Sequence, residues 1–197
     1  MNSSRRALLK AGLVASPLLA LNLFKPVVVS AAVAPSQSEL WYWYPGHSLA
    51  IKAAGKDTGG TCMWMLVENS PKEGVPFHKH LNEDESFYVV DGQFEITVGD
   101  KTVIGGPGTY AYGPRNTPHR WTNVGRARGR LLNVFTPAGL ENYFLAVAVP
   151  IASSSAKPCV DMAAMAIKMA SLRGKYGLIR TGERKYPSTD ESFGCST

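Results

Sequence analysis

The sequence predicts a single all-β domain, a sandwich or barrel of short strands, followed by a short helical extension. The chain has 197 residues, of which 45% are hydrophobic, so it can bury one core of ordinary size but not two large ones. Between Leu40 and Pro137, short alternating or β-rich runs are separated by turn residues. This stretch lacks the strand–helix–strand rhythm of a parallel sheet, which favours an antiparallel sandwich or barrel.

The first 31 residues are typical of an export signal. Residues 4–10 read Ser-Arg-Arg-Ala-Leu-Leu-Lys and resemble the twin-arginine (Tat) pattern S-R-R-x-F-L-K, with Leu8 in place of Phe. The uncharged stretch that follows has 14 residues, too few to cross a bilayer core of about 30 Å as a helix. We therefore expect a Tat-type signal peptide at residues 1–31, contact with the Tat translocase, and a periplasmic or secreted bacterial protein. A basic tail and an uncleaved anchor are the alternatives.

The charge balance excludes nucleic-acid binding as the main function. The formal net charge is +6, but the first 31 residues carry four positive charges and no acid, so their removal leaves +2 on 166 residues. No basic run with interleaved aromatic residues occurs elsewhere. Mean hydropathy is −0.08 and the apolar residues are dispersed, which fits neither a multi-span membrane protein nor a disordered chain.

Within the predicted barrel domain, residues 40–137, seven runs have the pattern of strands. Turn residues such as Asp91-Gly92, Gly99-Asp100 and the Gly-rich segment 105–108 separate several of them. The runs are Ser48–Ala54, Thr61–Glu68, Ser86–Asp91, Phe94–Val98, Tyr110–Tyr112, Arg120–Val124 and Arg130–Thr136.

The composition changes after Pro137, so residues 138–197 are expected to form a helical extension and tail. Residues 138–148 favour a short helix, and residues 151–158 read as a linker. Asp161 can cap a helix that runs to about Arg173, with Gly174 and Gly177 ending it. That helix would carry one apolar stripe, a cover on the barrel or a dimer contact, formed by Met165, Met169, Leu172 and Tyr176.

Three of the four histidines form a candidate metal site with one carboxylate. His78 and His80 are two apart, so on a strand both imidazoles share a face. We expect a short turn at Leu81–Asp84 to bring the chain back antiparallel and place Glu85 beside them. His119 is the third imidazole. Such a donor set suits one divalent ion of Fe, Mn, Ni, Cu or Zn. It leaves one or two coordination positions of a five- or six-coordinate metal open.

Other interpretations of these residues remain open from the sequence alone. A lone His-x-His pair is often explained by ordinary surface or core histidines. Glu83 and Asp84 compete with Glu85 for the ligand role, although their position favours a turn. His47 lies outside the pattern and is expected to be structural or on the surface.

The spacing of these residues resembles the cupin family. His78-x-His80, four residues, Glu85, six residues and Gly92 match the first cupin motif, G-x5-H-x-H-x3,4-E-x6-G, although Gly74 lies at a different spacing ahead of the histidines. The second motif, G-x5-P-x-G-x2-H-x3-N, is matched by Gly108, Pro114, His119 and Asn123. Asn116 replaces its central Gly, and Asn tolerates positive φ better than most residues.

From about Trp41 to Tyr176 the chain is similar to small single-domain cupins of the quercetin 2,3-dioxygenase type. The resemblance implies a double-stranded β-helix (jelly-roll) barrel whose four ligands are His78, His80, Glu85 and His119. If these face the interior, strand parity turns Phe87, Val89 and Trp121 inward, as walls of a substrate pocket or as ordinary core.

The function that the resemblance implies is a metal-dependent dioxygenase. Its substrate would be a small molecule of flavonol or enediol type, with O2 as co-substrate and Glu85 as both ligand and general base. A non-oxidative metalloenzyme of isomerase or decarboxylase type and a non-catalytic binding protein are the alternatives, because cupins host many reactions. A homodimer is expected by analogy.

The three cysteines allow one disulfide and one free thiol in an oxidising compartment. Cys62, Cys159 and Cys195 permit three pairings. Cys159–Cys195 is favoured because both residues lie in the extension.

Overall fold

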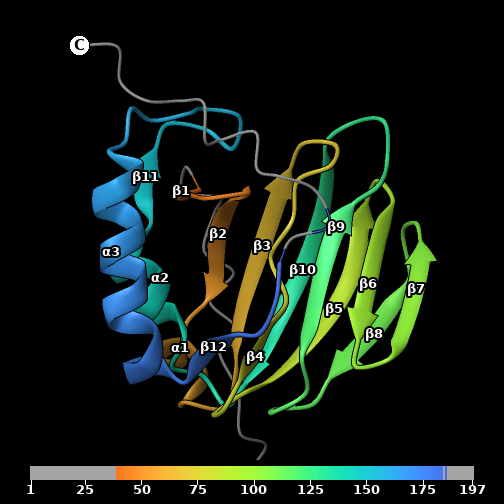
Figure 1. The fold of residues 1–197 in the computed structure, drawn as a ribbon, viewed down its shortest axis with the longest axis horizontal. Coiled ribbons are helices and arrows are strands. Elements are labelled where there is room, and N and C mark those ends of the chain that lie inside the picture. Colours follow the sequence, from red (N-terminus) through yellow and green to blue (C-terminus); the bar gives the residue numbers. More distant parts are fainter. Residues whose placement is uncertain (1–38, 184, 186–197) are drawn as a thin grey trace, which may run out of the picture. The chain divides into compact units, whose positions relative to one another are not determined.

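Two antiparallel sheets face one another and enclose the core (Figure 1). In this computed structural model, residues 39–183 and 185 are described. The seven-stranded sheet contains, in spatial order, β11 (Val149–Ile151), β1 (Trp41–Tyr44), β2 (His47–Ala53), β3 (Met63–Asn69), β10 (Gly129–Thr136), β5 (Asp84–Asp91) and β8 (Tyr110–Gly113). The five-stranded sheet contains β12 (Leu178–Arg180), β4 (His78–His80), β9 (His119–Asn123), β6 (Phe94–Val98) and β7 (Lys101–Gly105). The predicted all-β fold is confirmed.

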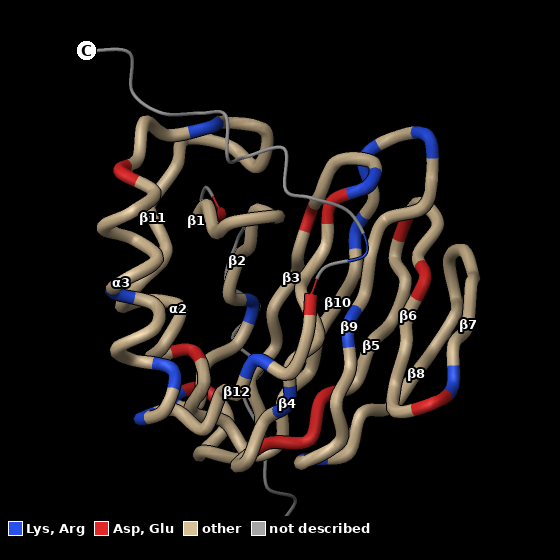
Figure 2. The backbone as a smooth tube through the Cα atoms, in the orientation of Figure 1, with Lys and Arg blue, Asp and Glu red and all other residues tan. Residues whose placement is uncertain are grey.

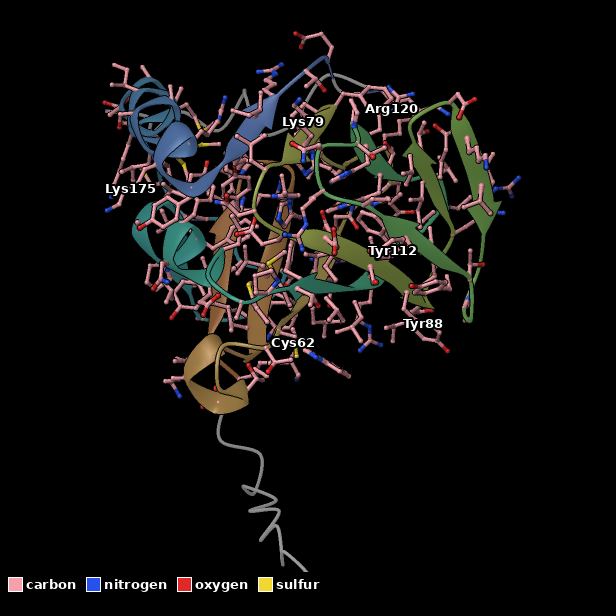
Figure 3. All side chains as sticks on the ribbon, turned by 90° about the horizontal axis from the view of Figure 1, so that it is seen from below. Cys62, Lys79, Tyr88, Tyr112, Arg120 and Lys175 are labelled. Atoms are coloured by element: carbon pink, nitrogen blue, oxygen red, sulfur yellow. The ribbon has the colours of Figure 1, made fainter. Side chains whose placement is uncertain are left out.

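Side chains alternate between the core and the outer surface along the central strands. On β5, Phe87 and Val89 are fully buried, whereas Tyr88 is 46% exposed. Tyr112 on the neighbouring β8 also faces outward (Figure 3). This period of two is the pattern expected for a strand with one face on the core. It determines which residues of each strand can reach the interior.

Each of the seven runs predicted from the sequence overlaps one strand, and β4 holds the His-x-His pair. Four further strands, β1, β7, β11 and β12, were not expected. β11 and β12 have only three residues each, and β7 is exposed along almost its whole length. None of these three therefore shows the alternation by which a half-buried strand is recognised. β1 reads Trp-Tyr-Trp-Tyr and also lacks a polar alternation.

Helices α2 (Glu141–Val147) and α3 (Met162–Arg173) follow the barrel strands and lie side by side next to β1 and β2 (Figure 1). The predicted cap is present: the Asp161 side chain accepts a hydrogen bond of 2.9 Å from the Ala164 amide. A single 3-10 turn, Gly174–Tyr176, continues α3 and ends at Gly177, whose φ is +67°. A further short helix, α1 (Gly55–Thr58), connects β2 to β3.

The predicted apolar stripe of α3 packs against the barrel. Met165 and Met169 are buried, and Leu172 and Tyr176 pack partly buried against the same core. The Tyr176 ring meets that of Tyr143 on α2, with 5.8 Å between centroids. The stripe is therefore a cover on the barrel.

Two expectations fall outside the described residues: the Tat-type signal at residues 1–31 and the tail at residues 186–197. Among the described residues, no helix is both long and apolar enough to span a bilayer. Cys62 is a free thiol and Cys159 is disulfide-bonded. Cys195 also lies outside the described residues, so its pairing stays a prediction.

Candidate metal centre

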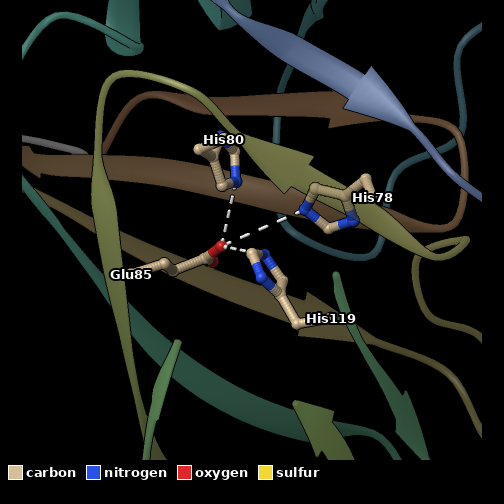
Figure 4. Close-up of side chains that lie close together, drawn as sticks. All are labelled: His78, His80, Glu85 and His119. Atoms are coloured by element: carbon tan, nitrogen blue, oxygen red, sulfur yellow. Dashed lines mark hydrogen bonds and ion pairs between the residues drawn. The ribbon is translucent and has the colours of Figure 1, made fainter. Parts of the chain in front are cut away.

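Four side chains from the two sheets meet in the interior (Figure 4). His78 and His80 come from β4, His119 comes from β9, and Glu85 comes from β5. One ligand atom from each residue can be chosen so that all four lie within 4.8 Å of one another. The candidate ligands predicted from the sequence are thus brought together.

The path of the chain between β4 and β5 differs from the expected antiparallel turn. β4 pairs with β9 and β12 in one sheet, whereas β5 pairs with β10 and β8 in the other. Residues 81–83 therefore carry the chain across the barrel. Glu85 faces the three imidazoles from the opposite sheet. Because both partners of β4 come from much later in the chain, local spacing did not indicate this crossing.

All three histidines turn the same ring atom, Nε2, toward one carboxylate oxygen. The distances from Glu85 Oε2 to Nε2 are 2.9 Å for His119, 3.1 Å for His80 and 4.0 Å for His78. The four side chains are almost completely buried, except that the His78 side chain is 13% exposed. A set of converging nitrogen and oxygen donors in a water-poor interior is what a divalent ion requires.

Backbone carbonyls fix the orientation of two of the rings. His78 Nδ1 donates to the Pro76 carbonyl oxygen at 2.8 Å, and His119 Nδ1 donates to that of Thr117 at 3.0 Å. A proton held on Nδ1 leaves the lone pair on Nε2, which is the form that binds a metal. Both rings are therefore held ready for coordination by their own chain, two residues upstream.

The contact between His119 and Glu85 fits a cation better than a direct hydrogen bond. A carboxylate oxygen only accepts, and a His119 ring protonated on Nδ1 directs a lone pair at it from 2.9 Å. Within the described residues this Nε2 has no partner with hydrogen-bond geometry. Two lone pairs at this distance repel unless positive charge lies between them. The cluster is therefore compatible with a single metal ion.

The protonation states also suit metal binding. Burial alone would raise the pKa of Glu85, but positive charge shared with the His119 and His80 rings outweighs burial and holds this pKa well below its usual range. Burial, together with the neighbouring His119 and His80, lowers the pKa of His78 well below 6.5. At neutral pH the site thus presents an ionised carboxylate and a neutral His78 ring.

Two buried residues that sequence reasoning did not place in the site support the ligands. Asn133 on β10 donates from Nδ2 to Glu85 Oε1 and is 1% exposed. Glu83 was expected to be a turn residue, but it is 4% exposed and its Oε2 lies 3.8 Å from His80 Nδ1. Burial raises the pKa of Glu83. Both side chains lie behind ligands, and no motif in the sequence identifies them.

Asp84, the other competitor for the ligand role, faces away from the site. Its carboxylate binds the Arg115 side chain at 3.1 Å and the Arg115 amide at 2.8 Å. These hydrogen bonds lower the pKa of Asp84 to about 2. The prediction that ranked Glu85 above Asp84 agrees with this geometry.

A cavity of about 500 Å³ opens from this cluster of histidines and Glu85, within the range of about 300–1,000 Å³ that is usual for small-molecule sites. Trp121 lines it, as expected for the substrate pocket, but Phe87 and Val89 do not. Phe87 instead packs behind His119, with 5.5 Å between ring centroids, and Val89 is fully buried in the core. Strand parity turned both residues inward correctly, but they lie deeper than the cavity.

His47, which the sequence placed outside the site, also lines this cavity. It is 5% exposed, and its ring lies 5.3 Å from that of Trp121 and 5.1 Å from that of Tyr44. The histidine is therefore not on the surface. The strand pattern of β2 alone does not predict that His47 lies near the other three histidines.

The turn before His119 keeps its shape despite the missing glycine. Asn116 has a φ of +66°, and its amide donates to the His80 carbonyl oxygen at 2.7 Å. The Thr117 amide closes the turn onto the Pro114 carbonyl oxygen at 3.1 Å. Asn thus adopts the left-handed conformation that the motif normally assigns to Gly.

Comparisons with known proteins agree with this architecture. Residues 65–135 match the family model described as "Cupin domain". Over 80 residues the chain is 28% identical to quercetin 2,3-dioxygenase of Bacillus subtilis. The aligned segment covers 41% of this chain and only 24% of that protein.

Solved structures of low sequence identity are also similar. KdgF from Halomonas sp. has a TM-score of 0.47 at 22% identity, covering 52% of this chain and 89% of that one. Oxalate decarboxylase from Bacillus subtilis has a TM-score of 0.43 at 23% identity, covering 49% of this chain and 28% of that one. The segment that matches the cupin domain model, residues 65–135, contains all four converging side chains, and the two facing sheets agree with the cupin jelly-roll fold.

Proposed function

We propose that this protein is an exported metal-dependent dioxygenase that acts on a small molecule with adjacent oxygen atoms, of flavonol or enediol type. The observation that carries the proposal is the convergence of three Nε2 atoms and one carboxylate at the inner end of a cavity. The partial similarity to quercetin 2,3-dioxygenase supports this reaction class.

The residues that would hold the metal are His78, His80, Glu85 and His119. When bound, the ion would supply a Lewis-acidic and redox-capable centre that brings substrate and O2 together. This donor set suits Fe, Mn, Ni, Cu or Zn.

Glu85 is proposed to accept the proton of a substrate hydroxyl. The carboxylate is ionised at neutral pH and so can accept a proton, but its pKa lies well below the usual range, so the transfer would require a substrate hydroxyl acidified by the bound metal. Asn133 donates to Oε1 and so restrains the carboxylate, while Oε2 remains turned toward the imidazoles.

Apolar side chains around the cavity would exclude water from the reacting groups. Val75, Phe135, Phe144 and Trp121 contribute to this wall. A dry wall strengthens electrostatic interactions inside the site and suits flat aromatic ligands.

The test combines elemental analysis with O2 uptake by the full-length protein. We expect about one equivalent of a divalent metal per chain and O2-dependent turnover of a flavonol, with both lost in His119→Ala. Arg126→Ala, a change in an exposed loop residue, is the control and should retain both. Turnover of flavonol, catechol and 1,3-diketone substrates without O2 uptake would replace the proposal with a non-oxidative metalloenzyme. A folded protein without bound metal would indicate a binding protein.

We further propose export by the Tat route, which carries folded proteins and would allow the metal to be acquired before export. Replacing Arg5 and Arg6 with Lys should retain the protein in the cytoplasmic fraction, whereas the unchanged chain should appear in the periplasm or medium. Equal distribution of the two forms would refute this route.

A further inference from the structure

The outer wall of the cavity is formed by the C-terminal segment, beyond the part of the chain that matches the cupin domain. Helix α3 and strand β12 both follow residue 135 and both contribute lining residues. Figure 2 shows Lys and Arg positions at the end of α3 and on β12. The chemistry of this added wall differs from that of the metal end and indicates which ligands the cavity accepts.

We propose that the cavity selects an organic acid, with its apolar body under α3 and its carboxylate on Arg173. The inference rests on the proposed function only in taking this cavity as the ligand site. It does not require that the reaction uses O2.

The apolar half of this proposal follows from the side chains of α3. Met162, Met165 and Met169 line the cavity along one face of the helix, and Phe144 of α2 adds an aromatic ring. Met165 and Met169 are 6% and 7% exposed. Methionine side chains are flexible and polarizable, so they can adapt to an aromatic or aliphatic body of variable shape.

The acidic half follows from the charges at the same wall. Arg173 is the last residue of α3, lines the cavity and is half-buried. Across residues 39–183 and 185 it has no ion pair or hydrogen bond. The other cavity-lining arginine, Arg180, is paired with Glu183 and also donates to the Gly182 carbonyl oxygen.

Arg173 therefore contributes positive charge that the wall does not neutralise. Glu85, the remaining acid of the cavity, is engaged by the imidazoles and Asn133. A guanidinium group offers parallel donors that match a carboxylate, and the contact gains strength where water is partly excluded.

A purely structural role for Arg173 is the rival explanation, because a cation at a helix C-terminus stabilises the helix. The two roles differ in what they affect. A helix-stabilising charge changes the melting temperature, whereas a ligand contact changes the preference for charged over neutral ligands.

The experiment measures binding of biphenyl-4-carboxylate and of its neutral amide by calorimetry, under anaerobic conditions, with the full-length protein as purified. We expect the carboxylate to bind at least about tenfold more tightly than the amide, as for a hydrogen bond to a charged group. Arg173→Gln should abolish this preference and leave the amide affinity within about threefold. Arg173→Lys should retain part of the preference for the carboxylate. This result would show that the loss in Arg173→Gln does not come from misfolding.

Lys168→Gln is the matched control, because it removes the same charge from an exposed position on the same helix. It should leave the preference unchanged. Equal affinity for the two compounds, or no binding of either, overturns the proposal. A preference that persists in Arg173→Gln overturns it too, since the metal or the imidazoles would then hold the carboxylate. None of these results depends on turnover, so failure of the dioxygenase proposal would be seen separately.

Discussion

Replacing Asn133 with Leu tests whether a residue behind the ligands controls metal binding. Asn133 lies at the centre of β10, between Met65 of β3 and Phe87 of β5. Its Nδ2 donates to Glu85 Oε1, and both side chains are almost completely buried. Leu has a similar volume and cannot donate, so the substitution removes the hydrogen bond and leaves little cavity.

The expected magnitude differs between stability and metal affinity. A hydrogen bond to a charged group contributes about 1.5–3 kcal/mol. However, within the described residues Asn133 Oδ1 has no partner, and removing a buried unsatisfied acceptor returns about 1–3 kcal/mol. The free energy of unfolding of the metal-free protein should therefore fall by less than about 2 kcal/mol. Metal affinity should fall about 10–100-fold, the usual effect of losing a group that orients a ligand.

The assay is a competitive Zn²⁺ titration against a chelating dye, with thermal unfolding of the metal-free protein alongside. Asn142→Leu is the control, because Asn142 is exposed and, among residues 39–183 and 185, its side chain donates only to the Gly139 carbonyl oxygen. It should leave the affinity unchanged. A Zn²⁺ affinity of Asn133→Leu within about threefold of the unchanged protein would refute the idea that this hydrogen bond positions Glu85.

Three further predictions follow from the surroundings of the ligands. Glu83→Gln should weaken Zn²⁺ binding about 10–100-fold, because the carboxylate faces His80 Nδ1; unchanged affinity would assign Glu83 a purely structural role. Because the pKa of His78 is lowered on folding, the unfolded chain binds more protons below pH 6.5, so the metal-free protein should lose stability as the pH falls from 7.5 to 5.5, by up to about 1.4 kcal/mol per unit for this group. His78→Asn should flatten that slope in chemical denaturation, and an identical slope would contradict the assignment. Gly74→Ala should reduce the free energy of unfolding by about 1–3 kcal/mol in the same measurement, because the added Cβ would lie 2.2 Å from the Trp121 carbonyl oxygen. An unchanged free energy of unfolding would show that the backbone around Gly74 can shift to accommodate the methyl group.

The sequence by itself determined the fold class, the core-facing side of several central strands and the four residues that cluster. Period-two alternation turned Phe87 and Val89 toward the core, and the Asp161 cap with its apolar stripe predicted α3. Such signals are local, since they depend on residues within a few positions of one another. Motif spacing added the association of His119 with the pair on β4.

Tertiary structure alone decided which sheet each strand joins and how deep each inward side chain lies. It placed Glu85 across the barrel from the histidines, put Glu83 and Asn133 behind the ligands, and brought Arg173 to the cavity wall. Strand parity distinguishes two faces but does not specify the opposing layer. That layer is set by pairings between segments far apart in the chain, such as β4 with β12, whose stability depends on the packed core as a whole.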